Sequence, residues 1–179
     1  SRKSKYDQYL RQKSVNIFTA QERLGFKLFF SDALGCSTCH GGRDFHQPAQ
    51  GANFANVGLY NCEGKYRIRD EGLSVYTGKN ADNGAFRIPS LRNVALTDPY
   101  YHDGSANSLE EVIKNYERGG RTEVSPGCKQ AGIDNPNKDK RLKRFTLSSA
   151  ERKALIAFLD TLTDTSYLKN PHFLDPFNR

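Results

Sequence analysis

The sequence of 179 residues contains no methionine and no tryptophan, and only four of its residues are cysteines. The absence of methionine rules out a thioether sulfur as a metal ligand from within this chain. No apolar run approaches the roughly 20 residues that a membrane-spanning helix needs, so we expect no membrane span. The first residues, SRKSKYDQYLRQKS, lack the apolar centre of a signal peptide, and we therefore expect a mature or trimmed end.

The composition is polar and basic, with a mean hydropathy of −0.73, 36% hydrophobic residues and a formal net charge of +7. A core built from these residues alone would be modest, and a large apolar cofactor would enlarge it. The densest basic run is KDKRLKR at 138–144. Because no nucleic-acid-binding motif or clustered basic face is present, we expect no nucleic-acid partner. The charge indicates a solvated basic surface, or one that steers an acidic partner.

Three segments are expected to be helices, because each combines a capping box with apolar residues at helical spacing. The boxes are Thr19 with Glu22, Ser108 with Glu111, and Ser148 with Glu151. Between and after these helices lie long loops, 41–107 and 119–145, that are rich in Gly, Asn and Asp. Loops of this length in a small domain are usually functional.

The fold is therefore predicted to be all-α and loop-rich, with three main helices around one cofactor. We expect an N-terminal arm or inter-domain linker over 1–18, one domain over 19–165 and a C-terminal tail over 166–179. The alternating pieces in the loops are too short to predict a sheet.

The most specific motif is CSTCH at 36–40. The C-x-x-C-H spacing is typical of covalent attachment of a c-type haem. Cys36 and Cys39 would form thioethers with the two vinyl groups, and His40 would bind the iron. A thioredoxin-like pair would follow a strand and would not need the histidine. A zinc site needs four ligands, and the chain has no second C-x-x-C. We therefore predict a cytochrome c-type domain with one covalent haem c.

The other two cysteines, Cys62 and Cys128, lie in the two separate long loops. Haem attachment of this kind takes place outside the cytosol, where disulfides persist. We therefore predict a periplasmic location and a disulfide between these cysteines, with two buried free thiols as the alternative.

Much of the chain resembles the second haem domain of the bacterial dihaem cytochrome c peroxidase family, which includes MauG. The segment FRIPSLRNVALTDPYYHDGSANSLEEVIKNYERGG, at 86–120, carries the closest resemblance. SKYDQYL, LGFKLFFSDALGCSTCHGG, FANVGLYN and LSSAERKALIAFLDTLT are also similar to that domain. Family members have two C-x-x-C-H motifs and this sequence has one, so the domain with the peroxide-reactive haem is not in it. A fragment, a split subunit and a protein without the first domain all stay open.

The resemblance also implies roles for individual residues. It matches Thr97 and Pro99 to positions whose carbonyls bind a calcium ion between the two haems, with a third ligand from the other domain. It places Tyr116 where ordinary family members have a methionine that binds the second haem, and MauG-like members also have tyrosine there. Tyr116 is thus predicted to be the sixth iron ligand, with simple packing against the haem as the alternative.

Further polar residues are expected around the haem. Arg87 and Arg92 flank the PSL turn and suit the two propionates, because a guanidinium pairs well with a carboxylate. The alternative is that both are ordinary surface arginines. His102 would bond to a propionate or within its loop, and is less favoured as an iron ligand. His46 lies too close to the haem motif to reach the other haem face, and His172 is expected to be solvated.

The predicted function is that of a haem domain in a peroxidase or MauG-like oxidase that uses hydrogen peroxide as oxidant. It would carry electrons or oxidising equivalents to or from a haem in a second domain or subunit, and would exchange electrons with a redox partner protein, an acidic one given the charge. By itself the chain would mainly transfer electrons. A stand-alone monohaem electron carrier and a non-catalytic haem sensor are the alternatives.

Overall fold

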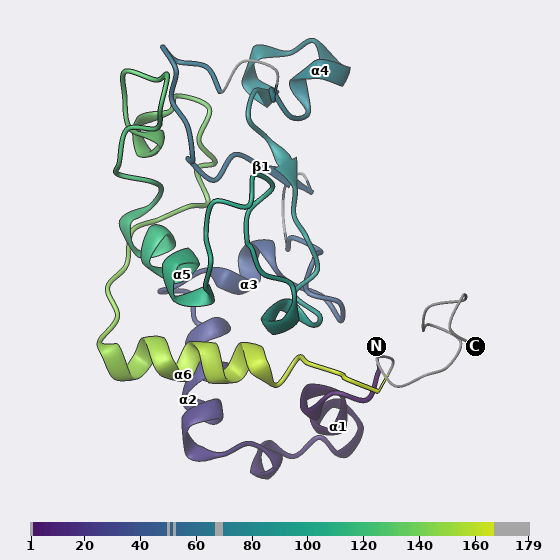
Figure 1. Ribbon diagram of the computed structural model, residues 1–179. Helices are drawn as coiled ribbons and strands as arrows, with labels where there is room; N and C mark the ends of the chain where they lie inside the picture. The colour runs from purple at the N-terminus through teal and green to yellow at the C-terminus, as the bar shows by residue number, and fades with distance from the viewer. Residues whose placement is uncertain (1, 50, 52, 67–69, 167–179) are drawn as a thin grey trace, which may run out of the picture.

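The computed structural model describes residues 2–49, 51, 53–66 and 70–166. The described residues form a mostly helical, loop-rich domain (Figure 1), which confirms the predicted fold class. Its helices are α1 (Lys5–Gln12), α2 (Ala20–Phe29), α3 (Cys36–Cys39), α4 (Ser74–Thr77), α5 (Leu109–Arg118) and α6 (Ser149–Asp160). Short 3-10 segments are η1 (Val15–Ile17), η2 (Asn80–Asp82), η3 (Val94–Leu96) and η4 (Gly132–Asp134). The tail residues 167–179, with His172, lie outside the described part of the chain.

The three predicted helices correspond to α2, α5 and α6, and each begins at the predicted cap residue. Complete capping boxes are present in α2 and α6. At α5 the box is only half formed: Ser108 accepts from the Glu111 amide, but the Glu111 carboxylate accepts from Asn107 instead. The α5 helix ends at Gly119, which takes a left-handed conformation with φ of 80°.

Helix α1 and a small sheet were not predicted. Within the segment expected to be an arm, Ser4 and Asp7 form a capping box that starts α1. The helix packs on the domain, because the Tyr6 amide donates to the Thr161 carbonyl and the Tyr6 ring is buried. The sheet pairs β1 (Phe54–Ala55) with β2 (Phe86–Arg87) in antiparallel register.

The main core lies between α2, α6 and the loop that follows the C-x-x-C-H motif. Phe18, Phe29, Phe45 and Phe158 are almost fully buried there and contact one another edge to face or tilted. Gly25 permits the close approach of α2 and α6, since a Cβ at this position would lie 1.9 Å from the Ala154 carbonyl oxygen. Figure 1 shows α6 crossing over α2 at one end of the molecule.

The opposite end is held together by a disulfide between Cys62 and Cys128, which confirms the predicted bridge. It joins the two long loops across 66 residues of sequence. Beside it, Leu59, Tyr60 and Tyr66 form a second buried cluster. None of the helices in the described part of the chain is long and apolar enough to cross a membrane.

Candidate functional site

A cavity of about 440 Å³ lies between the two clusters and is lined by α3, α5, α6 and the segments 86–102 and 139–145. Its volume is within the range of roughly 300–1,000 Å³ of pockets that hold small molecules and cofactors. Most of its wall is apolar, from residues such as Phe29, Leu34, Val57, Ile88, Leu91, Val94, Leu109, Ile113, Phe145, Leu155 and Leu159. A large apolar group would therefore complete the core of this domain.

The three motif residues line one part of this cavity. Cys36 and Cys39 begin and end the single turn of α3, so their side chains are neighbours on that turn. His40 follows directly, and its Nδ1 lies 3.1 Å from the Phe45 carbonyl oxygen, to which it donates. This bond leaves Nε2 as the nitrogen that can bind a metal, an arrangement common among metal-binding histidines.

Burial lowers the pKa of His40, against the opposing effect of the Phe45 and Pro89 carbonyls. The imidazole is therefore neutral, as a metal ligand must be. Burial raises the pKa of the Cys36 thiol to about 12 and also raises that of Cys39. Cys62 and Cys128 are committed to the disulfide, so they cannot complete a zinc site with this motif. Among the described residues, no group of three or more His, Cys, Asp or Glu side chains is arranged to hold a metal ion.

Tyr116 projects from α5 into the same cavity. Burial raises the pKa of its phenol far above the usual range, with smaller effects from Tyr101, Cys39 and Cys36. The phenol is thus neutral in the protein alone, and a bound cation would be needed to stabilise its anion. The structure brings Tyr116 together with Cys36, Cys39 and His40, although it comes from an element far away in the sequence.

Four of the other predicted residues also line the cavity: Arg87, Thr97, Pro99 and His102. His102 Nε2 lies 2.7 Å from Asp70 Oδ2, and its ring stacks on Phe86 with centroids 3.6 Å apart. One nitrogen of His102 is therefore already engaged with a carboxylate.

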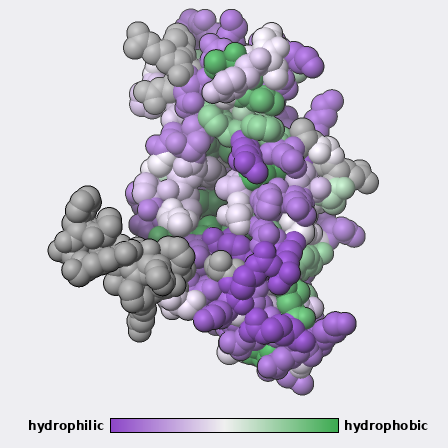
Figure 2. Space-filling view, turned by 90° about the vertical axis from the view of Figure 1, so that its right-hand side faces the viewer, coloured by the Kyte–Doolittle hydropathy of each residue, from purple (hydrophilic) through white to green (hydrophobic). Residues whose placement is uncertain are grey.

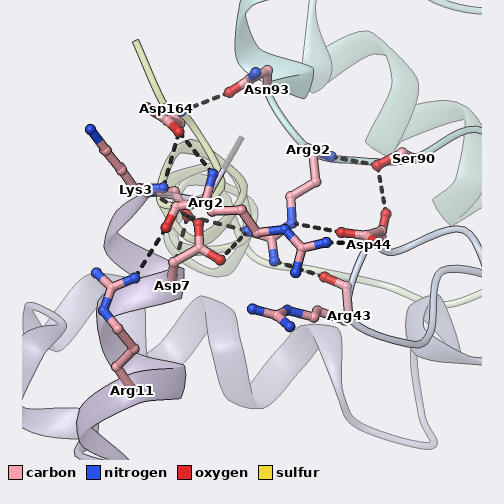
Figure 3. A network of polar contacts seen from close by, with 11 residues as sticks. Arg2, Lys3, Asp7, Arg11, Arg43, Asp44, Ser90, Arg92, Asn93 and Asp164 are labelled. Carbon is pink, nitrogen blue, oxygen red and sulfur yellow. Dashed lines mark hydrogen bonds and ion pairs between the residues drawn. The ribbon is translucent and has the colours of Figure 1, made fainter. Parts of the chain in front are cut away.

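Arg92 is placed differently, because it is not among the residues that line this cavity. Its side chain is 8% exposed, and its guanidinium lies 3.1 Å from the buried Asp7 carboxylate and donates to the Arg43 carbonyl (Figure 3). The buried Asp7 carboxylate needs a cation beside it, and Arg92 supplies that cation. Asp7 lies 85 residues before Arg92, so the residues around the PSL turn could not predict this pair.

Arg141 was not predicted to belong to the site, because it lies in the basic run interpreted as solvated surface. Arg141 lines the cavity together with Asp139, Leu142 and Lys143. Its guanidinium forms a double hydrogen bond with Asp139, at 2.9 Å from Nε to Oδ1 and 2.6 Å from Nη2 to Oδ2. The apolar Leu142 inside a run of charges was the available signal.

Comparison with known proteins connects this geometry to a family. No protein-family model matches the chain. It is 32% identical over 175 residues to cytochrome-c peroxidase IdrP1 of Denitromonas iodatirespirans, covering 84% of this chain and 42% of that protein. It is 31% identical over 189 residues to the methylamine utilization protein MauG of Paracoccus denitrificans, covering 92% and 47% respectively.

The chain also superposes on solved structures of proteins of these kinds. A crystal structure of a MauG-like protein associated with microbial copper homeostasis superposes with a TM-score of 0.88 and 38% identity, over 99% of this chain and 56% of that chain. The diheme peroxidase BthA from Burkholderia thailandensis superposes with a TM-score of 0.64 and 25% identity, over 92% and 47%. The chain thus spans about half the length of the relatives it matches, and it is a homologue of the dihaem cytochrome c peroxidases and MauG proteins over that half.

Proposed function

We propose that this chain is the second, C-terminal haem domain of a dihaem peroxidase or MauG-like oxidase. It carries one haem c on Cys36 and Cys39, and passes electrons or oxidising equivalents to or from a peroxide-reactive haem in another domain or subunit. The observation that supports this most directly is the apolar cavity in which the C-x-x-C-H residues and Tyr116 meet. The homology to about half the length of the dihaem proteins supports a second haem in a separate domain or subunit.

Bound haem supplies an iron centre that accepts and donates single electrons. The protein residues would hold it in place and tune it. His40, oriented by the Phe45 carbonyl, and Tyr116 are the two residues that would bind the iron. The apolar lining excludes water, which lets these ligands control the iron potential.

The polar residues of the lining would serve the rest of the haem and its surroundings. Arg87, His102 and Arg141 are suited to the propionates, since each can donate to a carboxylate. Thr97 and Pro99 are exposed and also line the cavity, so they lie at its mouth. We propose that their carbonyls form part of a calcium site that the other haem domain completes.

The proposed arrangement makes 19–165 the haem domain, with residues 1–18, which pack on it through Tyr6 and Phe18, leading to the other half. The location is periplasmic, where haem attachment and the disulfide are both possible. A monohaem electron carrier is the second candidate, because the sequence has a single C-x-x-C-H motif. The haem count and mass of the native species separate the two.

The test is to produce the chain with a periplasmic haem-maturation system and extract it with acid and acetone. The haem should remain on the denatured protein, so that the haem absorption is found in the precipitated protein and not in the acetone. A Cys36→Ala/Cys39→Ala variant provides the control, because its haem should be extracted. Haem that leaves the unmodified chain would rule out covalent attachment and with it the proposed function.

A further inference from the structure

A second, open pocket lies outside the haem cavity, between α1 and the turn that follows the C-x-x-C-H motif. It is lined by Arg2, Tyr6, Asp7, Leu10, Arg11, Gly42 and Arg43. Figure 3 shows Arg11 on α1 reaching to the Arg2 carbonyl, and Arg43 extending from its turn toward α1. All three arginines are exposed to solvent. The face that carries α1 is largely hydrophilic at this end of the molecule (Figure 2).

The positive charges in this pocket exceed the negative ones. Asp7 is already neutralised by the buried Arg92, 3.1 Å away, and accepts from Ser4. Arg2 has a weak, exposed ion pair with Asp44 at 3.9 Å. Within the described part of the chain, neither Arg11 nor Arg43 forms an ion pair with a carboxylate; Arg11 donates only to the Arg2 carbonyl.

The pocket is connected to the haem ligand through few bonds. Arg43 lies three residues after His40, in a turn that is closed by pairing of Gly41 with Gln47. Arg92 holds the Arg43 carbonyl at 2.7 Å, and its guanidinium lies 5.5 Å from the centre of the Phe45 ring. Phe45 in turn accepts the hydrogen bond of His40 Nδ1. A group seated among the arginines is therefore next to the residues that orient the iron ligand.

We infer that this arginine pocket is the docking site for the carboxylates of an acidic redox partner protein. Arginine binds carboxylates in a two-pronged geometry, and a surplus of positive charge accelerates encounter with an acidic surface. One electron would pass from the reduced partner to the ferric haem, or in reverse, with no bond made or broken. The electron-transfer part of this inference rests on the proposed function. The binding of carboxylates to the arginine pocket does not depend on the haem.

The first experiment measures equilibrium binding of a fluorescently labelled hexaglutamate peptide to the haem-loaded chain at low ionic strength. In Arg11→Glu/Arg43→Glu, the dissociation constant should rise about tenfold or more, since the local charge is reversed. The difference should shrink at high salt because salt screens exposed charges. The matched control is Lys65→Glu/Lys79→Glu, which changes net charge equally; Lys79 lies beside α4, at the other end of the molecule from α1 (Figure 1).

The control variant should bind the peptide within about twofold of the unmodified chain, because Lys65 and Lys79 are distant from the pocket. Equal weakening in both double variants would show that only net charge matters and would overturn the inference. If the double reversal disturbs folding, Arg43→Gln removes one charge from an exposed side chain and should still weaken binding.

The second experiment tests electron transfer by stopped-flow oxidation of the ferrous haem. In Arg11→Glu/Arg43→Glu, the rate with anionic ferricyanide should fall about tenfold at low salt. The rate with cationic tris(phenanthroline)cobalt(III) should not fall. An unchanged ferricyanide rate would overturn the redox part of the inference even if the peptide binds. A chain that takes up no haem would contradict the proposed function instead, while peptide binding would still report on the pocket.

Discussion

As the proposed iron ligand, Tyr116 should set the potential of the haem, because the sequence has no methionine to take its place. Tyr116→Met should raise the haem potential by on the order of 0.1 V, since axial ligands span about 0.8 V and a neutral thioether favours ferrous iron. Tyr116→Phe should change the ferric spectrum and admit small ligands such as cyanide. Absorption spectroscopy and redox titration would measure both effects.

Tyr100→Phe is the matched control for this prediction. Tyr100 also lines the cavity, but its hydroxyl donates to the Val94 carbonyl at 3.0 Å. Its removal should leave the ferric spectrum unchanged. If Tyr116→Phe likewise had no spectral effect, Tyr116 would be a packing residue and not a ligand.

Asp164 links the start of the chain to the end of α6. Burial acts to raise its pKa, but hydrogen bonds from Ser166, Lys3 and Arg2 outweigh burial and hold the pKa well below the usual range. A group with a lowered folded pKa stabilises the fold above its unfolded pKa of about 3.9, and this stabilisation is lost as pH falls through the folded pKa.

Asp164→Asn should therefore lower the free energy of unfolding at pH 7 by about 1.5–3 kcal/mol, the range for hydrogen bonds to charged groups. The difference from the unmodified protein should narrow below about pH 4, where the unfolded carboxylate takes up its proton. Denaturant unfolding across this pH range would measure it. Asp32→Asn, at an exposed position, should change stability at pH 7 by no more than about 0.5 kcal/mol. If the difference in the free energy of unfolding between Asp164→Asn and the unmodified protein stayed constant down to low pH, the Asp164 carboxylate would not be the stabilising group.

At the scale of secondary-structure elements, the crossing of α2 and α6 determines the shape of the core. Alanine usually favours a helix over glycine by about 1 kcal/mol. At Gly25 the added methyl would meet the Ala154 backbone oxygen at 1.9 Å, so the helices must move apart. Gly25→Ala should therefore lower the free energy of unfolding by about 2–3 kcal/mol, as overpacking does.

Denaturant unfolding of Gly25→Ala, beside Lys27→Ala on the exposed side of α2, would separate packing from helix propensity. Lys27→Ala should be within about 0.5 kcal/mol of the unmodified protein. A Gly25→Ala protein that is as stable as the original would mean that the two helices have room to separate.

At the scale of the whole molecule, the Cys62–Cys128 disulfide compensates for loops with little regular structure. It encloses a separation of 66 residues. Cys62→Ser/Cys128→Ser should lower the free energy of unfolding by about 2–4 kcal/mol, because the unfolded chain regains conformational freedom. Reductant should destabilise the unmodified protein by a similar amount and leave the double variant unaffected. If full reduction left the free energy of unfolding of the unmodified protein unchanged, this account would be wrong.

The proposed second haem domain leads to a further prediction. The exposed rim at Thr97 and Pro99, with Tyr100 behind it, should lie against a second haem-bearing domain or subunit. Native mass spectrometry of protein from its own cells should find two haems in one assembly. An active species that holds this chain alone, with one haem, would favour the monohaem carrier.

Local signals allowed much of the fold to be predicted. Capping residues next to helical apolar spacing identified α2, α5 and α6, because both depend on residues within one or two turns. The polar helix α1 was missed although Ser4 and Asp7 cap it, because only its Tyr6 is buried, against core residues distant in the sequence. The β1–β2 pair was also missed. Each strand is only two residues long, which is too short to show an alternating pattern, and the two strands are far apart in the sequence.

The sequence by itself determined the C-x-x-C-H motif, the caps of α2, α5 and α6, and the absence of any methionine. These features depend on covalent spacing and near neighbours. Only the tertiary structure decided that Arg141 lines the cavity while Arg92 neutralises Asp7, and that Arg11 and Arg43 share a pocket. The physical reason is that a charged side chain is placed by the partner and the burial it meets after the chain has folded, and these come from distant parts of the sequence.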